Sequence, residues 1–198
     1  MENLSFPLSF EFKVTTLAND FVIKDAQGQL LSYVRQKMFK LKEDILCFAD
    51  PSKTRLLYRI RANQWIDFSA TYTFFDAYEK EMGRVARKGA ASIWRATYQV
   101  FDLDQHHEFT IREENPWTKV MDFLLTEIPL VGIFTGYFLN PSYIVLDAQH
   151  QPVIRLKKEP SFWGRKFSVI RIAELEAPQM ERLLLSLMMM VLLERRRG

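Results

Sequence analysis

The sequence predicts a mainly β protein: a closed antiparallel β-barrel around a central hydrophobic C-terminal α-helix, with one further amphipathic helix. Three observations predict this fold. Apolar and polar residues alternate with period two over most of the chain, aspartate-led turns recur between the alternating runs, and an almost unbroken apolar run fills residues 183–193. Five such turns imply about ten strands, which are too many for a single flat sheet that neither curls nor closes.

Residues 54–62 (TRLLYRIRA) show the alternation most clearly, because apolar and arginine side chains take turns along the segment. The buried face of the expected strand carries Leu56, Tyr58 and Ile60, and its solvent-exposed face carries Arg55, Arg59 and Arg61. Residues 91–102, 152–158 and 166–172 repeat the pattern. A helix cannot keep such a pattern on one face, since its period is 3.6 residues.

The expected turns each begin with an aspartate that follows an apolar run. Aspartate initiates turns by accepting hydrogen bonds from its own downstream backbone, and glycine supplies positive φ. The segments pair Asp25 with Gly28, Asp50 with Pro51, Asp76 with Gly83, Asp102 with Asp104, and Asp147 with Pro152. The repeating unit is therefore a strand, an aspartate-led turn and a second strand.

Residues 117–128 break the β pattern and predict an amphipathic helix. Asn115 is a suitable N-cap, Pro116 suits the first helical position, and Pro129 ends the segment. The apolar stripe consists of Trp117, Val120, Met121, Leu124, Leu125 and Ile128. We expect this helix, within an insertion near residues 116–139, to cover an edge or end of the sheet; contact with a membrane or a partner is the alternative.

The apolar run near the C-terminus predicts a second helix over residues 178–195. Pro178 can open it, Glu181 is expected in the first turn, and Arg195 lies at the end, which suits the helix dipole. The apolar part, interrupted only by Ser186, spans roughly 16 Å, whereas a bilayer core is about 30 Å thick. A helix that is apolar on all sides is expected inside protein. We therefore favour a buried core helix over a tail anchor or an oligomer contact.

The bulk composition fits one domain over residues 1–198. The chain carries 27 basic and 24 acidic side chains, a formal net charge of +3 that does not indicate a nucleic-acid partner. Cys47 is the only cysteine, so we expect a buried free thiol and no intrachain disulfide. The N-terminus lacks the pattern of a signal peptide, which predicts a cytoplasmic location, with peripheral attachment to a membrane as an option.

Motifs for catalysis, metals or cofactors are not recognisable in the sequence. His106, His107 and His150 fall in expected turns, and Asp102, Asp104 and His106 lack the spacing of a known metal site. No G-x-S-x-G, H-E-x-x-H, Walker or G-x-G-x-x-G motif is present. We therefore expect no enzymatic activity, no cofactor and no metal.

Hairpins of the form F-x-I-x-D-x-x-G, as in residues 21–28, together with a C-terminal hydrophobic helix, resemble the tubby C-terminal superfamily. This superfamily includes the phospholipid scramblases and the LURP-one-related proteins. The matching segments are residues 21–50, 56–77, 83–89, 94–102 and the final helix. The resemblance implies a twelve-stranded barrel around a central helix and phosphoinositide binding through a basic patch. No cysteine-rich, proline-rich or calcium-binding stretch is visible, which argues against calcium-triggered scrambling.

Two acid-poor stretches, residues 83–95 and 154–171, are the candidate ligand-binding surface. Basic side chains near aromatic residues suit the phosphates of lipid head groups, although outward strand faces are often Lys and Arg without any ligand. The candidate residues are Arg84, Arg87, Lys88, Arg95, Arg155, Lys157, Lys158, Arg165 and Lys166. The function we expect is a non-enzymatic module that binds phospholipid or another anionic partner at a membrane surface. The alternatives are scramblase-like lipid translocation and a protein-interaction scaffold without a lipid role.

Overall fold

The computed structural model describes residues 4–13, 19–37, 44–63, 71–88, 97–114, 142–160 and 165–195. Within these residues the chain forms twelve strands and one helix, α3 (Ala177–Arg195). The strands are β1 (Leu8–Phe12), β2 (Asp20–Lys24), β3 (Leu30–Gln36), β4 (Asp44–Phe48), β5 (Leu56–Ala62), β6 (Thr71–Asp76), β7 (Glu81–Lys88), β8 (Thr97–Phe101), β9 (His107–Glu113), β10 (Ser142–Asp147), β11 (Pro152–Glu159) and β12 (Lys166–Arg171).

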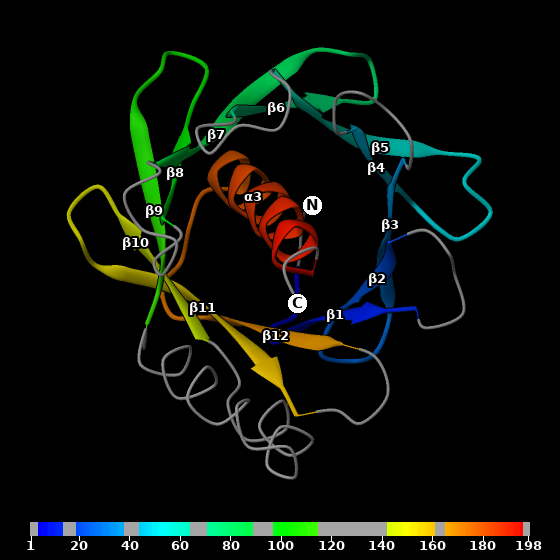
Figure 1. Ribbon diagram of the computed structural model, residues 1–198. Coiled ribbons are helices and arrows are strands. Elements are labelled where there is room, and N and C mark those ends of the chain that lie inside the picture. The colour runs from blue at the N-terminus through cyan, green and yellow to red at the C-terminus, as the bar shows by residue number, and fades with distance from the viewer. Residues whose placement is uncertain are drawn as a thin grey trace, which may run out of the picture.

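The strands form a closed antiparallel barrel in which each strand pairs with its neighbours in the chain. The seam is made by β1 and β12, where Leu8 lies opposite Val169 and Phe10 opposite Phe167. Figure 1 looks along the barrel and shows α3 inside the ring of strands. The predicted closed barrel is confirmed. Its twelve strands are the number that the resemblance implies: the five aspartate-led hairpins supply ten, and β1 and β12 flank them and pair with each other.

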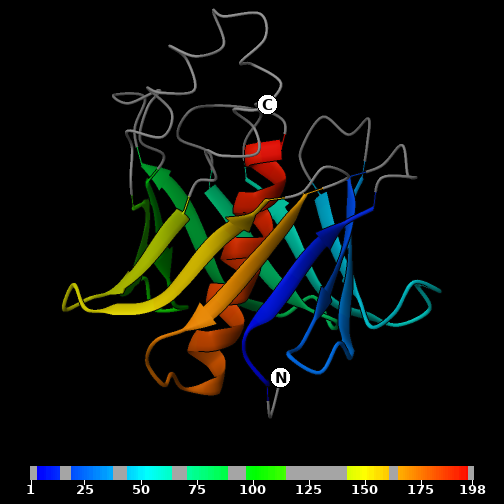
Figure 2. The same cartoon turned by 90° about the horizontal axis from the view of Figure 1, so that it is seen from below.

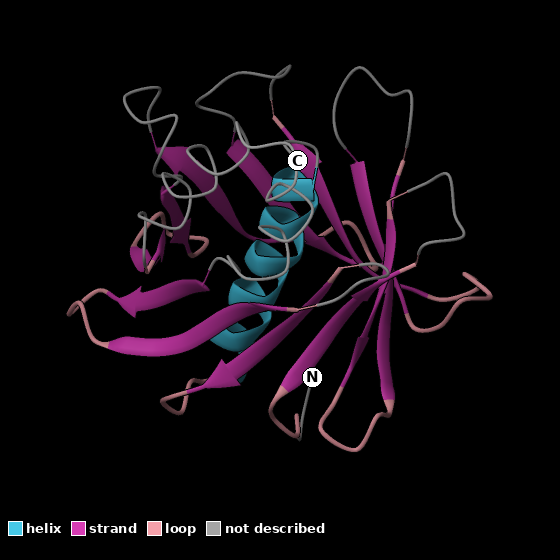
Figure 3. Ribbon diagram, turned by 60° about the horizontal axis from the view of Figure 1, so that its bottom comes forward, coloured by secondary structure: helices cyan, strands magenta, loops and turns pink. Residues whose placement is uncertain are grey.

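The inward side chains of the strands and α3 form one apolar core. All residues from 183 to 192 are 1% exposed or less, including Ser186, whose hydroxyl donates to the carbonyl oxygen of Arg182 at 2.8 Å. The single polar group in this part of α3 is therefore satisfied without water. The predicted buried helix is confirmed: α3 is apolar on every side because strands surround it, as Figure 3 shows.

The five predicted hairpin turns all lie at one end of the barrel, which we call the turn end (Figure 2). In the first of them, the Asp25 carboxylate accepts the backbone N–H groups of Gln27 at 3.0 Å and Gln29 at 2.8 Å. Asp147 does the same for Gln149 at 2.9 Å and Gln151 at 2.8 Å. The aspartate therefore replaces part of the backbone pairing that each turn interrupts.

The residue three positions after each aspartate has positive φ, which permits the bulge that follows a tight turn. These residues are Gly28, Lys53, Glu79, Gln105 and His150, with φ between 60° and 80°. The expectation that glycine supplies the positive φ is thus correct only at Gly28. In the other four turns the aspartate contacts hold a side-chain-bearing residue in this conformation.

Gly83 lies within β7 rather than in a turn, at φ +134°. A Cβ atom here would lie 2.6 Å from the Phe101 carbonyl oxygen and 2.6 Å from Cδ of Arg182. Glycine is therefore required here, because a Cβ atom would meet the backbone of the neighbouring strand β8 as well as the Arg182 side chain of α3. The Arg182 side chain extends across Gly83 and donates from Nε to Oε2 of Glu108 at 2.6 Å. This hydrogen bond raises the pKa of Arg182.

Two further expectations concern the helices. Glu181 is not in the first turn of α3, because the helix begins at Ala177 and its first turn contains no acidic residue. The amphipathic helix predicted over residues 117–128, and the insertion near 116–139, lie outside the described residues.

Candidate functional site

Cross-strand register brings basic residues from three strands onto one outward row. Lys88 of β7 lies opposite Thr97 of β8, and Thr97 lies opposite Arg112 of β9. Arg112 lies opposite Ile144 of β10, which in turn lies opposite Arg155 of β11. The residues that alternate with these face the core, so all five side chains are on the outer face of the barrel.

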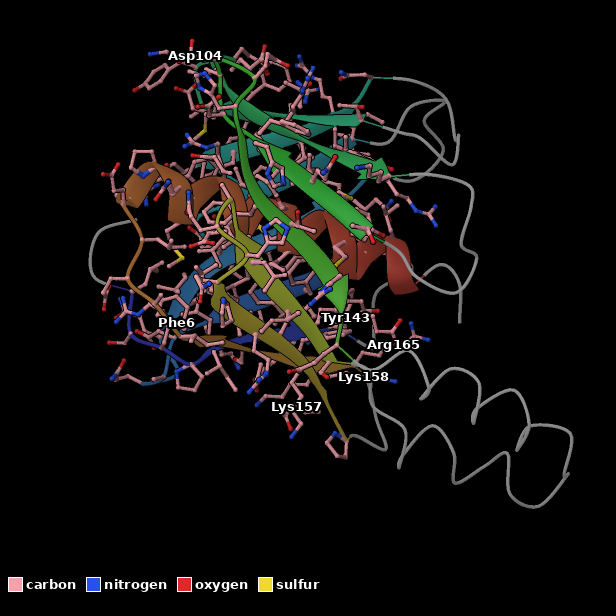
Figure 4. All side chains as sticks on the ribbon, turned by 90° about the vertical axis from the view of Figure 1, so that its left-hand side faces the viewer. Phe6, Asp104, Tyr143, Lys157, Lys158 and Arg165 are labelled. Atoms are coloured by element: carbon pink, nitrogen blue, oxygen red, sulfur yellow. The ribbon has the colours of Figure 1, made fainter. Side chains whose placement is uncertain are left out.

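Lys157 extends this surface, because it follows Arg155 by two residues and also faces outward. Figure 4 shows it at the end of β11, away from the core. We call Lys88, Arg112, Arg155 and Lys157 the basic row. Neighbouring strands are about 4.8 Å apart, so the cations of β7, β9 and β11 follow one another at about 10 Å.

Most of the basic side chains in the basic row are free to bind an anionic ligand. Lys88, Arg112 and Lys157 are exposed, and within the part of the chain that the structure describes they make no ion pair. Arg155 donates to Glu114 at 2.9 Å, but both side chains are more than a third exposed, at 44% and 36%. Such a surface pair contributes little and exchanges readily with another anion.

The arginines of β5 form a contrasting group, because acids already neutralise them. Arg59 donates to both carboxylate oxygens of Asp44, at 2.7 and 2.9 Å, and to Glu79 at 3.0 Å. Arg61 also donates to Glu79. The hydrogen bond from Arg59 is the main cause of a lowered pKa for Glu79. Arg59 and Arg61 of the predicted basic face are therefore part of an ion-pair network rather than a free surface.

Lys166 is similarly compensated at the seam of the barrel. Its Nζ lies 3.1 Å from Oε1 of Glu11, and Nζ of Lys24 lies 2.6 Å from Oε2 of the same carboxylate. The hydrogen bond from Lys24, followed by that from Lys166, lowers the pKa of Glu11. Lys166 lies on the outer face two residues from Ser168, which is opposite Lys157, but its charge is compensated because it shares one acid with a second lysine.

Three other predicted residues take different positions. Arg84 faces outward, with its guanidinium carbon 5.2 Å from the centre of the Phe101 ring. Arg87 lies directly opposite the buried Tyr98, and the alternation of β7 puts it on the inner face. Lys158 lies opposite the buried Phe167, also on the inner face. Neighbours in the sequence, such as Lys157 and Lys158, are therefore on opposite sides of the wall.

Arg165 immediately precedes β12, and its carbonyl oxygen accepts the backbone N–H of Phe12 at 2.9 Å. Figure 4 shows Arg165 near Lys158, toward the end of the barrel opposite the turn end. Arg95, the remaining predicted residue, lies outside the described residues. Of the nine predicted residues, register gathers Lys88, Arg155 and Lys157, and it adds Arg112, which had not been predicted.

The turn end carries the opposite charge. Residues 25–29, 49–55, 76–81, 102–106, 147–151 and 172–176 contain three basic residues, Lys53, Arg55 and Lys80. The same segments contain ten acidic residues: Asp25, Asp50, Asp76, Glu79, Glu81, Asp102, Asp104, Asp147, Glu174 and Glu176. Part of this excess follows from the fold, because every hairpin turn begins with aspartate. An anionic ligand is therefore disfavoured at this end.

The histidines and Cys47 take no part in the basic row. His106 and His150 lie in turns as expected, whereas His107 starts β9 and its Nε2 lies 2.9 Å from Oγ1 of Thr110. The predicted position of His107 in a turn is wrong by one residue. Cys47 is buried as predicted, and burial raises the pKa of its thiol to about 12. A thiol with this pKa is not a nucleophile at neutral pH.

Asp102, Asp104 and His106 converge, with potential ligand atoms within 4.8 Å of one another. Their proximity follows from the turn. The Asp102 carboxylate accepts the His106 backbone N–H at 2.8 Å and lies 3.2 Å from Nδ1 of the same residue.

The fold defines the class of protein: a closed twelve-stranded barrel around a hydrophobic helix is the tubby C-terminal-like, or scramblase-like, fold. Within this class the chain belongs to the LURP-one-related family, whose model matches residues 31–192. No curated protein and no solved structure matches the chain. Among the described residues, no helix has the length and apolar character needed to cross a membrane.

Proposed function

We propose that this protein is a non-enzymatic module that binds anionic phospholipid head groups at a membrane surface through the basic row. The observation that supports the proposal is the register that aligns Lys88, Arg112 and Arg155 on the outer face, with Lys157 beside them. Lysine and arginine side chains bind phosphate oxygens through charge-assisted hydrogen bonds.

The spacing of the cations favours a surface over a single small anion. A compact phosphate ligand requires several donors that converge on it, whereas the cations of the basic row lie about 10 Å apart along a convex wall. An anionic leaflet offers many separate head groups and attracts each nearby basic side chain with about 1 kcal/mol. A row of separate cations is therefore suited to a membrane.

Lipid translocation has less support. It would require α3 to enter the bilayer, but residues 183–192 of α3 are enclosed by the barrel. The scaffold alternative depended on residues 116–139, which lie outside the described ranges.

Co-sedimentation with vesicles tests the proposal. The full chain is mixed at low salt with vesicles of phosphatidylcholine alone, or of phosphatidylcholine with phosphatidylserine or a phosphoinositide. We expect binding to the anionic vesicles only. Reversing three charges of the basic row, in Lys88→Glu/Arg112→Glu/Lys157→Glu, should weaken this binding more than about tenfold.

The matched control is Lys53→Glu/Arg55→Glu/Lys80→Glu, which changes the net charge equally but at the turn end. This variant should retain most of the binding. Equal loss in both variants would mean that only the net charge matters, and it would contradict the assigned surface. Equal binding of the wild type to neutral and anionic vesicles would contradict the proposal as a whole.

A further inference from the structure

A groove of about 590 Å³ opens at the turn end, beside the first residues of α3. Its lining comes from the start of β5, the β6–β7 hairpin, the β8–β9 turn and α3. Leu56, Met82 and Pro178 contribute apolar surface to it. A concave, partly apolar surface of this size is large enough to receive one or two side chains of a partner.

Two exposed apolar side chains belong to this groove. Four large apolar side chains are highly exposed among the described residues, and two of them, Tyr78 at 91% and Leu103 at 50%, line the groove. They come from the turns of neighbouring hairpins, because β7 pairs with β8. Exposed apolar residues that gather at a groove are typical of an interaction site, whereas scattered ones need no explanation.

The same two turns are strongly acidic. Residues 76–81 and 102–106 contain five acidic residues, Asp76, Glu79, Glu81, Asp102 and Asp104, and one basic residue, Lys80. Arg59 and Arg61 neutralise Glu79, while Glu81 is exposed at the groove. Arg182 also lines the groove, but its charge is bound by Glu108. Arg55 and Lys80 remain as cations of the lining, which also contains the acids Asp76, Glu81 and Glu181. With Asp102 and Asp104 in the neighbouring turn, acids still outnumber these two cations around the apolar surface.

From this combination we propose that the groove docks a basic amphipathic peptide segment of a protein partner. An aliphatic or aromatic side chain of the segment packs between Tyr78 and Leu103, and flanking lysine or arginine side chains approach Glu81 and Asp104. Apolar anchors supply most of the affinity in such contacts, and charge complementarity supplies orientation and partner selection. The inference does not depend on lipid binding, because none of these residues belongs to the basic row.

The test is selection of peptides from a displayed library of random sequences, about twelve residues long, on the purified full chain. We expect enriched peptides in which aliphatic or aromatic residues recur three or four residues apart, as on one face of a helix, with lysine or arginine at the positions between them. The affinity of a synthesised enriched peptide, measured by fluorescence anisotropy, should fall as the salt concentration rises, because exposed charges are screened. Selection of no peptides, or of neutral or acidic ones, would overturn the proposal.

The variant Tyr78→Ser/Leu103→Ser should weaken binding of the enriched peptide at least about tenfold. The control is Ile170→Ser/Ile172→Ser, which removes the other two exposed apolar side chains, at 40% and 45% exposure, outside the groove. Its affinity should stay within about twofold of the wild type. Equal effects of the two variants would overturn the assignment. Vesicle binding should be unchanged in Tyr78→Ser/Leu103→Ser, so failure of this inference is distinguishable from failure of the lipid proposal.

Discussion

The interior of the barrel and its five hairpin turns are both built from repeated sequence signals, but they depend on those signals differently. The buried residues of α3 share one core with side chains from strands that are distant in the chain. The packing of each of them therefore depends on many other parts of the barrel. Four of the turns are each fixed within five residues by one aspartate and its backbone, and the Asp50 turn is closed between Ala49 and Arg55. Changes in the interior should therefore be large and coupled, and changes in the turns small and independent.

The largest effect is expected for a charge in the interior. Leu185→Asp or Met189→Asp would place a carboxylate at a position that is now 0% exposed, without a partner. We expect a loss of several kcal/mol, enough to prevent folding. Circular dichroism and thermal unfolding measure it, with Leu185→Met as the volume-conserving control. A cooperatively folding Leu185→Asp protein would contradict the enclosed position of α3.

The close packing around Gly83 should be the next most sensitive feature. Gly83→Ala should lose about 2–4 kcal/mol, because the added methyl group meets Phe101 and Arg182 at a strained φ. Gly28→Ala is the matched control: its φ is +80°, and nothing lies within 4 Å of the added atom. It should lose only about 1 kcal/mol of strain. Equal losses in chemical denaturation would mean that the close approach at Gly83 is unimportant.

Removing one turn aspartate should cost less. Asp147→Ala deletes two hydrogen bonds to backbone N–H groups, those of Gln149 and Gln151. We expect a loss of about 1 kcal/mol in the free energy of unfolding. Asp147→Asn retains an acceptor oxygen and should restore most of this loss. If alanine and asparagine are equivalent, the aspartate is not what holds the turn.

The smallest effect is a gain. His150 has φ 64°. This conformation is strained for a residue with a Cβ atom but not for glycine. His150→Gly should therefore stabilise the protein by about 0.5–1 kcal/mol, and His150→Ala should not. The same change at Gln105 should add to it, because the two turns are separate. A non-additive pair would show that the turns are coupled after all.

Most of the barrel could be predicted from the sequence because its signals are local. Period-two alternation identified strands such as β5 and β11, and aspartate identified the five turns of the turn end. The count of twelve strands came from the resemblance to the superfamily, since β1 and β12 belong to none of the five aspartate-led hairpins. The glycine rule failed at Glu79 and Gln105 because hydrogen bonds to aspartate can hold other residues at positive φ.

The candidate surface was harder to predict because it depends on register between strands. Lys88 and Arg155 are far apart in the sequence, and Arg112 joins them only through the pairing of β7 to β11. Lys157 and Lys158 look equivalent in the sequence, yet alternation sends them to opposite faces. The compensation of Lys166 by Glu11 and of Arg182 by Glu108 likewise joins distant residues. A local charge pattern contains none of this information.

The position of α3 after all twelve strands has a consequence for synthesis of the protein. The ribosome releases every wall residue before the residues that fill the barrel, over roughly 10–40 seconds at ordinary elongation rates. Until residue 192 emerges, the inner faces of the strands have nothing to cover them. A nascent chain without α3 therefore exposes apolar strand faces, and a stalled ribosome would leave an aggregation-prone product.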